Sequence, residues 1–277
     1  MPELPEVETV VRGLKARIEG KRLLRLTLHR PDLRQAIPKG LAAKVEGRRV
    51  DRVDRRAKYI LLRLEDGGVL IVHLGMSGRL TLGDAARPAP PQRHDHALMT
   101  FEHGIEVRFN DQRRFGLIDY ARADDLPRHK LFQHLGPEPL TPTFDGATLA
   151  RLLAGKKTPI KSALLDQGVV VGIGNIYACE SLYWAGLSPK RLARTVQGDR
   201  AAHLAEAIKR VLNHAISVGG SSLRNYVSAS GELGNFQRHF AVYDREGERC
   251  PGCDCRTGIK RIVQSGRSTF YCAKRQR

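Results

Sequence analysis

The chain has 277 residues, which is enough for one large domain or two modest ones. Its 47 Lys and Arg outnumber its 29 Asp and Glu, so the formal net charge is +18. The hydrophobic fraction of 41% excludes wholesale disorder, and no apolar run approaches the roughly 18 residues of a membrane span. This charge favours a nucleic acid partner over the alternative of a generally basic enzyme. With no signal peptide in view, the chain is expected in the cytosol.

The first twenty residues predict one helix. Pro5 suits a first helical turn, and the apolar residues behind it recur at the spacing of one buried face. From residue 23 to residue 120 the pattern changes to short apolar runs, separated by turn sequences such as the Glu-Asp-Gly-Gly of residues 65–68. These runs predict the strands of a β-sandwich or barrel.

A Gly- and Pro-rich stretch near residue 136 separates the strands from a helical region. Residues 219–234 are rich in Gly, Ser and Asn and predict a long loop, a kind of segment that is often functional. Four of the five cysteines lie in the last 28 residues, which is not the pattern of a secreted disulfide scaffold. The predicted fold class is α+β, with a β-sandwich domain at 1–133, a linker at 134–148, a helical domain at 149–248 and a terminal hairpin at 249–277.

The first residues also carry a candidate nucleophile. If Met1 is removed, Pro2 becomes a secondary amine, and an α-amine with a pKa of about 7.7–8.0 is neutral far more often at pH 7 than a lysine. A neutral amine can attack a sugar aldehyde carbon and form a Schiff base. The carboxylates of Glu3 and Glu6 would be close enough for proton transfer. The same residues also suit an ordinary helix start, since acidic first turns are common.

Six blocks of sequence resemble, in order, the formamidopyrimidine-DNA glycosylase family. They are PELPEVET (2–9), RAKY (56–59), HLGMSG (73–78), DQRRFG (111–116), GIGNIY (172–177) and GRSTFYC (266–272). The resemblance extends over the whole chain. It implies a base excision repair enzyme that flips out and removes oxidised purines, such as 8-oxoguanine and formamidopyrimidines, and then cuts the abasic strand by β,δ-elimination. It also implies a helix–two-turn–helix element and a terminal zinc finger.

The resemblance implies a role for each catalytic residue. Pro2 would be the Schiff-base nucleophile, Glu3 the principal general acid and base, and Glu6 its support. Lys58 and Arg267 would join the catalytic set as ligands of the phosphates beside the lesion.

Further residues are implied to bind DNA. His73 would contact phosphate, and Asn175 would do so at a helix start, where backbone N–H groups favour anions. Lys161 would handle the oxidised purine, and the loop of residues 219–234 would cap it. The loop residues expected at the lesion are Ser221, Arg224, Asn225 and Tyr226.

Base flipping leaves a gap in the duplex, and three side chains are implied to fill it. These are Met76, Arg113 and Phe115. Met adapts to irregular gaps, Phe can wedge between base steps, and Arg113 could hydrogen-bond the orphaned base. The alternative for Met76 and Phe115 is packing in the protein core.

The cysteines depart from the family pattern. The family usually ends in C-x2-C-x16-C-x2-C, a spacing that suits tetrahedral zinc, but Arg275 stands where the fourth cysteine is expected. An additional cysteine lies in the first knuckle, so four thiolates remain: Cys250, Cys253, Cys255 and Cys272. One interpretation is a rearranged zinc site, and the other is a hairpin that folds without metal. Zinc is expected, since four clustered thiolates would otherwise be oxidisable.

Three alternatives to this enzyme remain to be weighed. A DNA-binding module without catalysis would suit the charge, but it would not need Pro2, Glu3 and Glu6. A sister glycosylase that resembles endonuclease VIII would prefer oxidised pyrimidines, and the insertion residues disfavour it. A zinc-binding RNA factor does not explain the first residues. The expected partner is double-stranded DNA with oxidised purines, bound by a cytoplasmic, nucleoid-associated monomer that needs no redox cofactor and no membrane.

Overall fold

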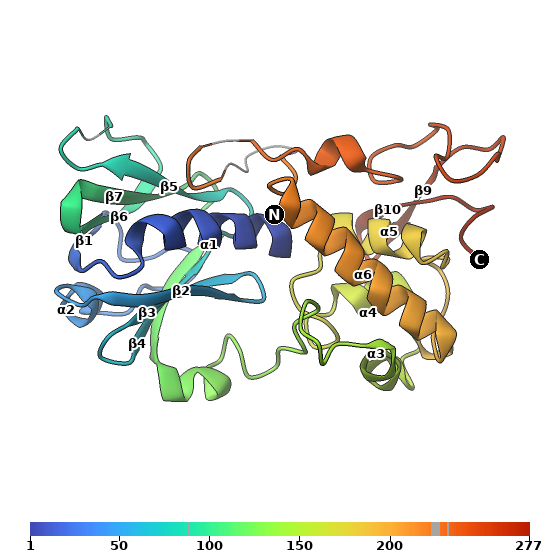
Figure 1. The fold of residues 1–277 in the computed structure, drawn as a ribbon, viewed down its shortest axis with the longest axis horizontal. Coiled ribbons are helices and arrows are strands. Elements are labelled where there is room, and N and C mark those ends of the chain that lie inside the picture. The colour runs from blue at the N-terminus through green and yellow to red at the C-terminus, as the bar shows by residue number, and fades with distance from the viewer. Residues whose placement is uncertain (88, 223–227, 232) are drawn as a thin grey trace. The chain divides into compact units, whose positions relative to one another are not determined.

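A computed structural model describes residues 1–87, 89–222, 228–231 and 233–277 (Figure 1). The chain forms two compact units. One contains Met1–Gln133 and Val218–Asn235, and the other contains His134–Ser217 and Phe236–Arg277. None of the helices in the described part of the chain has the length and apolar character to cross a membrane.

The first unit is a β-sandwich with a leading helix, as the sequence predicts. Helix α1 (Leu4–Ile18) has Pro5 in its first turn and buries one apolar face. Among its described residues, eight strands form two antiparallel four-stranded sheets, and one hydrophobic core joins α1 to both. The first sheet has the order β1 (Leu23–Leu28), β6 (Asp95–Phe101), β7 (Ile105–Asp111), β5 (Gly78–Asp84), and the second has β2 (Val50–Arg56), β3 (Tyr59–Leu64), β4 (Gly68–His73), β8 (Leu117–Arg122). Short helices connect them: α2 (Leu41–Val45), η1 (Glu102–Gly104) and η2 (Ala123–Arg128).

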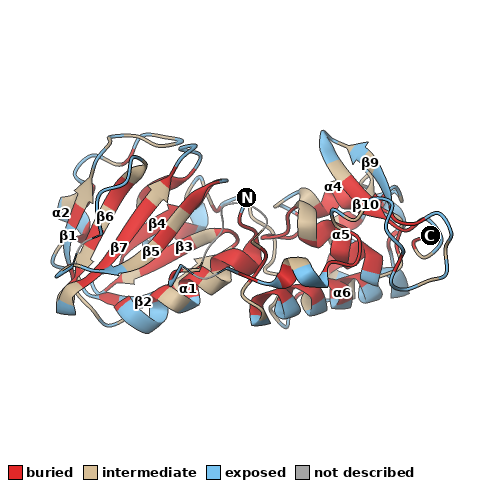
Figure 2. Ribbon diagram, turned by 90° about the horizontal axis from the view of Figure 1, so that it is seen from above, coloured by how far each residue is buried: buried red, intermediate tan, exposed pale blue. Residues whose placement is uncertain are grey.

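Strand β4 is buried at all six positions, so it is covered on both faces. This burial explains why its sequence, GVLIVH, is a continuous apolar run with no alternation. Figure 2 shows the buried positions concentrated along the strands of both sheets. The polar residue that ends this run, His73, is thereby placed at the edge of the core.

The second unit is helical and ends in a hairpin. It contains α3 (Gly146–Leu153), α4 (Ile160–Leu165), α5 (Asn175–Trp184), η3 (Ala193–Thr195), α6 (Asp199–Ser217), η4 (Phe236–His239), β9 (Lys260–Gln264) and β10 (Arg267–Tyr271). Helix α5 packs against α6 and against β10. Buried Glu180 on α5 accepts the backbone N–H groups of Ala241, Val242 and Tyr243 at 2.8–3.0 Å. These bonds fasten the chain that leads into the hairpin onto α5.

The segment Val218–Asn235 groups with the β-sandwich unit, whereas the sequence placed it in the helical domain of residues 149–248. The reason is tertiary: Leu82 in β5 donates its N–H to the carbonyl of Ala229 at 2.9 Å. Gly13 in α1 makes room for the same residue, since a Cβ built there would lie 2.8 Å from the Ala229 Cβ. The stretch 134–148, expected as a linker, groups with the helical unit, where Gly136 donates its N–H to Gln167.

Candidate active site

Three buried residues at the start of the chain form the centre of the candidate site. Pro2, Glu3 and Glu6 are all shielded from solvent. One Glu6 oxygen, Oε2, accepts the backbone N–H of Glu3 at 2.8 Å, which is half of a capping box. The other oxygen, Oε1, accepts the N–H of Ser221 at 2.8 Å and its hydroxyl at 3.3 Å. Glu6 therefore joins the first helical turn to the segment Val218–Asn235.

Close packing around Glu6 requires a glycine. Gly220 has a φ of +77°, and a Cβ built on it would lie 2.9 Å from Glu6 Oε1. The predicted residue Ser221 is 4% exposed and is held on Glu6. The other predicted loop residues, Arg224, Asn225 and Tyr226, lie outside the described residues.

The amine end of the chain lies in the field of four charged groups. Burial lowers the pKa of the Met1 α-amine from its usual 8.0, although the residue as a whole is half-exposed. Glu3 and Glu6 oppose this shift, and the cations Lys58 and Arg113 add to it. An amine at this position is therefore more often neutral, and so more nucleophilic, than a fully hydrated one.

Lys58 is the second residue of a two-residue hairpin turn. It follows Ala57, whose φ is +54°, between β2 and β3. The residue is 6% exposed. Its charge lowers the pKa of the Met1 amine and of His73, so the ammonium lies near both groups.

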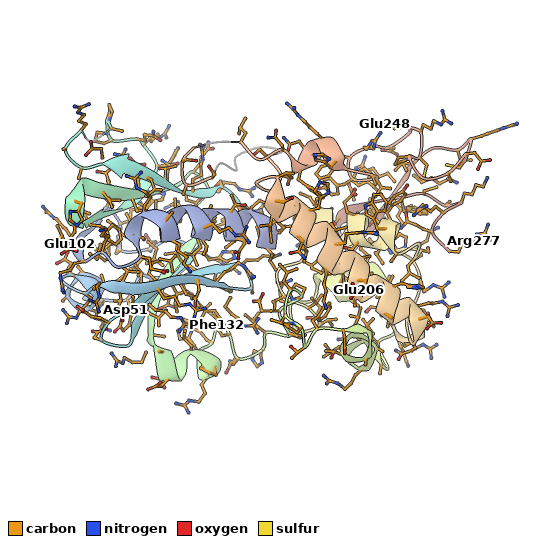
Figure 3. All side chains as sticks on the ribbon, in the orientation of Figure 1. Asp51, Glu102, Phe132, Glu206, Glu248 and Arg277 are labelled. Atoms are coloured by element: carbon orange, nitrogen blue, oxygen red, sulfur yellow. The ribbon has the colours of Figure 1, made fainter. Side chains whose placement is uncertain are left out.

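His73 is a neutral imidazole with a defined tautomer. Burial, with smaller contributions from the charges of Lys58 and Arg34, lowers its pKa from 6.5 to about 4. Nδ1 accepts the N–H of Gly75 at 3.0 Å, so the proton is on Nε2. The ring packs 4.9 Å from that of Tyr59, which contacts Phe132 (labelled in Figure 3). His73 can thus donate one hydrogen bond to an anion while carrying no charge.

Two neighbouring turns bring the predicted insertion residues to the surface. Met76 is 41% exposed and Phe115 is 43% exposed. The guanidinium of Arg113 lies 4.5 Å from the centre of the Phe115 ring. The alternative that Met76 and Phe115 pack in the core is wrong.

Buried Asp111 holds these two turns together. One carboxylate oxygen accepts the Ser77 hydroxyl and the other accepts the Gly116 N–H at 2.8 Å. Gly75 makes the contact possible, because its φ is +60° and a Cβ there would lie 2.3 Å from the carbonyl carbon of Phe115.

A basic pocket beside the second turn was missed from the sequence. It has a volume of about 470 Å³ and is lined by His29, Arg30, Arg93, His94, Asp95, His96, Gln112 and Arg114. Its one carboxylate, Asp95, is paired with Arg108 at 2.8 Å, so the pocket is cationic. The run RHDH at residues 93–96 could have indicated a basic site, but the other residues that line the pocket come from distant parts of the chain.

In the helical unit, Lys161 and Asn175 both bind the strand that begins with Arg267. Lys161 donates to the Ser268 carbonyl at 3.1 Å and to the Thr269 hydroxyl at 2.7 Å. The Asn175 amide donates to the same carbonyl at 2.9 Å. Lys161 is 1% exposed, so its ammonium is enclosed between α4 and this strand.

Arg267 itself is exposed at the start of β10. It follows the turn Ser265–Gly266, whose φ angles are +48° and +71°, as in a type I′ hairpin.

The turn of residues 166–174 before α5 is braced by Gln167, which accepts the Gly172 N–H at 2.8 Å and donates to the Ile173 carbonyl at 3.0 Å.

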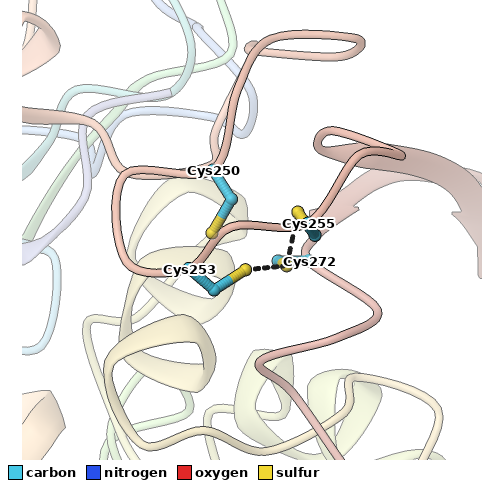
Figure 4. A group of neighbouring side chains, drawn as sticks. All are labelled: Cys250, Cys253, Cys255 and Cys272. Atoms are coloured by element: carbon cyan, nitrogen blue, oxygen red, sulfur yellow. Dashed lines mark hydrogen bonds between the residues drawn. The ribbon is translucent and has the colours of Figure 1, made fainter.

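The four predicted cysteines converge (Figure 4). Their Sγ atoms all lie within 4.8 Å of one another, and Cys272 is 3.5 Å from both Cys253 and Cys255. Zn–S bonds of about 2.3 Å in a tetrahedron place sulfur atoms roughly 3.8 Å apart, so the cluster fits such an ion. Arg275, at the position of the expected cysteine, instead stacks 4.9 Å above Tyr183 and donates to the Gly252 carbonyl at 3.2 Å.

Comparisons with known proteins agree over the whole chain. The formamidopyrimidine-DNA glycosylase N-terminal domain family matches residues 1–118, and the formamidopyrimidine-DNA glycosylase H2TH domain family matches residues 135–227. The chain is 55% identical to the formamidopyrimidine-DNA glycosylase of Rhodospirillum rubrum over 281 residues, which cover 100% of both chains. It is 50% identical to that of Gluconobacter oxydans over 272 residues, which cover 98% of both.

The solved structures that resemble this chain over almost its whole length belong to the same family. The Fpg protein of Thermus thermophilus superposes with a TM-score of 0.88 at 39% identity, over 99% of this chain and 98% of that one. Lactococcus lactis Fpg, in a complex with DNA that contains an abasic site, gives 0.89 at 34% identity over 99% of both chains. A mutant of the same protein with DNA that contains Fapy-dG gives 0.90 at 32% identity over 100% of both.

Proposed function

The chain belongs to the formamidopyrimidine-DNA glycosylase family, and from that premise we propose which of its residues carry out the reaction. It is a base excision repair glycosylase for oxidised purines with AP lyase activity, and its partner is DNA. We propose that it works as a monomer on the nucleoid in the cytoplasm. The observation that carries the assignment of residues is the buried cluster of Pro2, Glu3 and Glu6 beside the Lys58 ammonium.

The chemistry follows from an amine with carboxylates beside it. After Met1 is removed, the lone pair of the Pro2 nitrogen attacks C1′, the glycosidic bond breaks, and the base leaves with a proton. Glu3 protonates the ring oxygen as the sugar opens to the Schiff base. Loss of a C2′ proton then expels the 3′ phosphate, and a second elimination expels the 5′ phosphate. Glu6 is a positioning residue, because its oxygens hold Glu3 and Ser221.

Both units supply contacts to DNA in this proposal. Met76, Arg113 and Phe115 fill the space left by the flipped nucleotide, since all three are exposed on adjoining turns. Lys58, His73 and Arg267 bind phosphates, as does the basic pocket around His94 and Arg114. Lys161 and Asn175 act indirectly, by holding the strand that carries Arg267.

The cysteine cluster holds zinc in this proposal. Four thiolates that converge from Cys250, Cys253, Cys255 and Cys272 form a closed donor set, which is typical of structural sites. The ion would cross-link the chain before β9 to the end of β10. It has no part in the chemistry at Pro2.

Borohydride trapping tests the assignment of Pro2. We expect a covalent adduct with a duplex that holds one 8-oxoguanine opposite cytosine, mapped by mass spectrometry to Pro2 and absent from Pro2→Ala. An adduct mapped to a lysine would reject Pro2 as the nucleophile. A parallel duplex with an oxidised pyrimidine tests the endonuclease VIII-like alternative, and we expect it to react much less.

A further inference from the structure

Two exposed histidines outside the candidate active site lie against each other in the helical unit. His214 is in the last turn of α6, and His239 ends η4. Their ring centroids are 4.7 Å apart, and the ring planes meet at 62°. Buried Phe236 supports the pair, with its ring edge-on to His214 at 5.5 Å and 6.3 Å from His239.

Neither imidazole is engaged by the described part of the chain in a hydrogen bond or an ion pair. Both rings contact aromatic rings: each lies against the other and against Phe236. Both residues are exposed, so water and ions can reach the ring nitrogens. A ligand at these nitrogens would therefore displace no hydrogen bond or ion pair of the described residues.

The spacing of the rings suits a shared metal ion. Two imidazoles that bind one ion through nitrogens about 2.0–2.1 Å away place their ring centroids roughly 4.5–5 Å apart. The observed separation is 4.7 Å. We propose that His214 and His239 form a second metal site, which takes one divalent first-row ion of the kind that imidazole prefers, such as Ni²⁺, Cu²⁺ or Zn²⁺. Water completes the coordination, so this site is open and exchangeable.

The position of the site gives it a structural consequence. In the sequence, His214 precedes and His239 follows the segment Val218–Asn235. The two ends of that segment are already paired, because Asn235 donates its N–H to the Val218 carbonyl at 3.0 Å. An ion held by both rings cross-links α6 to η4 just beyond this pairing. Ion binding is therefore expected to raise the melting temperature of the protein, since the ion binds the folded state alone.

A calorimetric titration with Ni²⁺ tests the proposal on the full chain after its cysteines have been loaded with zinc. We expect one Ni²⁺ per chain. His214→Gln and His239→Gln should each weaken binding at least tenfold and should abolish the rise in melting temperature. The matched control is His203→Gln, because His203 is also exposed on α6 but is paired with no aromatic ring of the residues that the structure describes. It should bind Ni²⁺ as the unmodified chain does.

Absorption spectra recorded during the titration identify the ligands. We expect no Ni²⁺–thiolate charge-transfer bands, because the zinc-loaded cysteines should not exchange. Growth of those bands in step with binding would assign the ion to the cysteines and overturn the proposal. Equal affinity in all three variants, or no binding up to millimolar Ni²⁺, would overturn it as well.

Discussion

At the scale of the residue, buried Lys161 is proposed to hold the strand that carries Arg267. Its ammonium is enclosed and binds Ser268 and Thr269. We expect Lys161→Met to lower the free energy of unfolding by about 2 kcal/mol or more, because buried acceptors lose their donor. Chemical denaturation measures this loss. Lys157→Met, at an exposed lysine four positions away, should change it by less than about 0.5 kcal/mol. A residue that only contacts DNA would leave stability unchanged.

The depressed pKa of His73 makes stability depend on pH. The folded-state pKa is about 4 and the usual value is 6.5, so between these values the unfolded chain binds a proton that the folded chain does not. The contribution of neutral His73 to the free energy of unfolding is fully present above pH 6.5. It is lost as the pH falls towards 4, and the total loss is about 3 kcal/mol. Urea unfolding at pH 7.5 and 4.5 should show this drop in the free energy of unfolding. The drop should be smaller in His73→Gln, because that variant lacks the imidazole. An identical loss in both proteins would contradict the assignment.

At the scale of the element, the paired turns that carry Met76 and Phe115 depend on one glycine. Gly75→Ala forces a Cβ into the backbone of Phe115. Gly104 is a matched control, because its φ of +71° is similar but its nearest atom would be 3.6 Å away. We expect Gly104→Ala to lower the free energy of unfolding only by the left-handed backbone strain, about 1–2 kcal/mol. We expect Gly75→Ala to lower it by more and also to weaken DNA binding. Equal losses of stability would show that the turns can separate.

The hairpin of β9 and β10 should depend on metal. Zinc content, measured after dialysis, is expected to be near one ion per chain and to fall in Cys253→Ser. Cys179→Ser is the control, since Cys179 lies in α5 and is not part of the cluster. Chelation should lower the thermal stability of the unmodified chain. A full zinc content in Cys253→Ser would show that the additional cysteine is no ligand.

Periodicity was sufficient to predict α1 and a β-sandwich of short strands, and the family resemblance implied that Met76 and Phe115 are exposed. What the sequence could not provide were contacts between segments far apart in the chain. The attachment of Val218–Asn235 to the sandwich depends on Gly13 and Gly220, whose missing side chains matter only once the partner is in place. The burial of Lys161 could not be predicted from the sequence either, because a lysine is usually exposed. The basic pocket combines residues 29–30, 93–96 and 112–114, and no local pattern connects them.

For the molecule as a whole, the net charge of +18 predicts binding that weakens steeply with salt. The logarithm of the affinity for DNA should fall linearly with the logarithm of salt concentration. Arg267→Ala should reduce the magnitude of that slope by about one, because one phosphate contact is lost. Arg128→Ala should not change it, since Arg128 is already paired with Asp125 at 2.9 Å. Electrophoretic or anisotropy titrations at several salt concentrations give the slopes.

The carboxylate of Glu6 is shared between the backbone beside Pro2 and the segment that begins near Ser221. If a bound purine displaces that segment, Glu6 loses the two donors of Ser221 while it keeps the Glu3 N–H. A displacement of Ser221 would therefore change the hydrogen bonds of the same side chain that holds the backbone beside the nucleophile. Contact with the damaged base and the placement of Glu6 are thereby linked through one carboxylate.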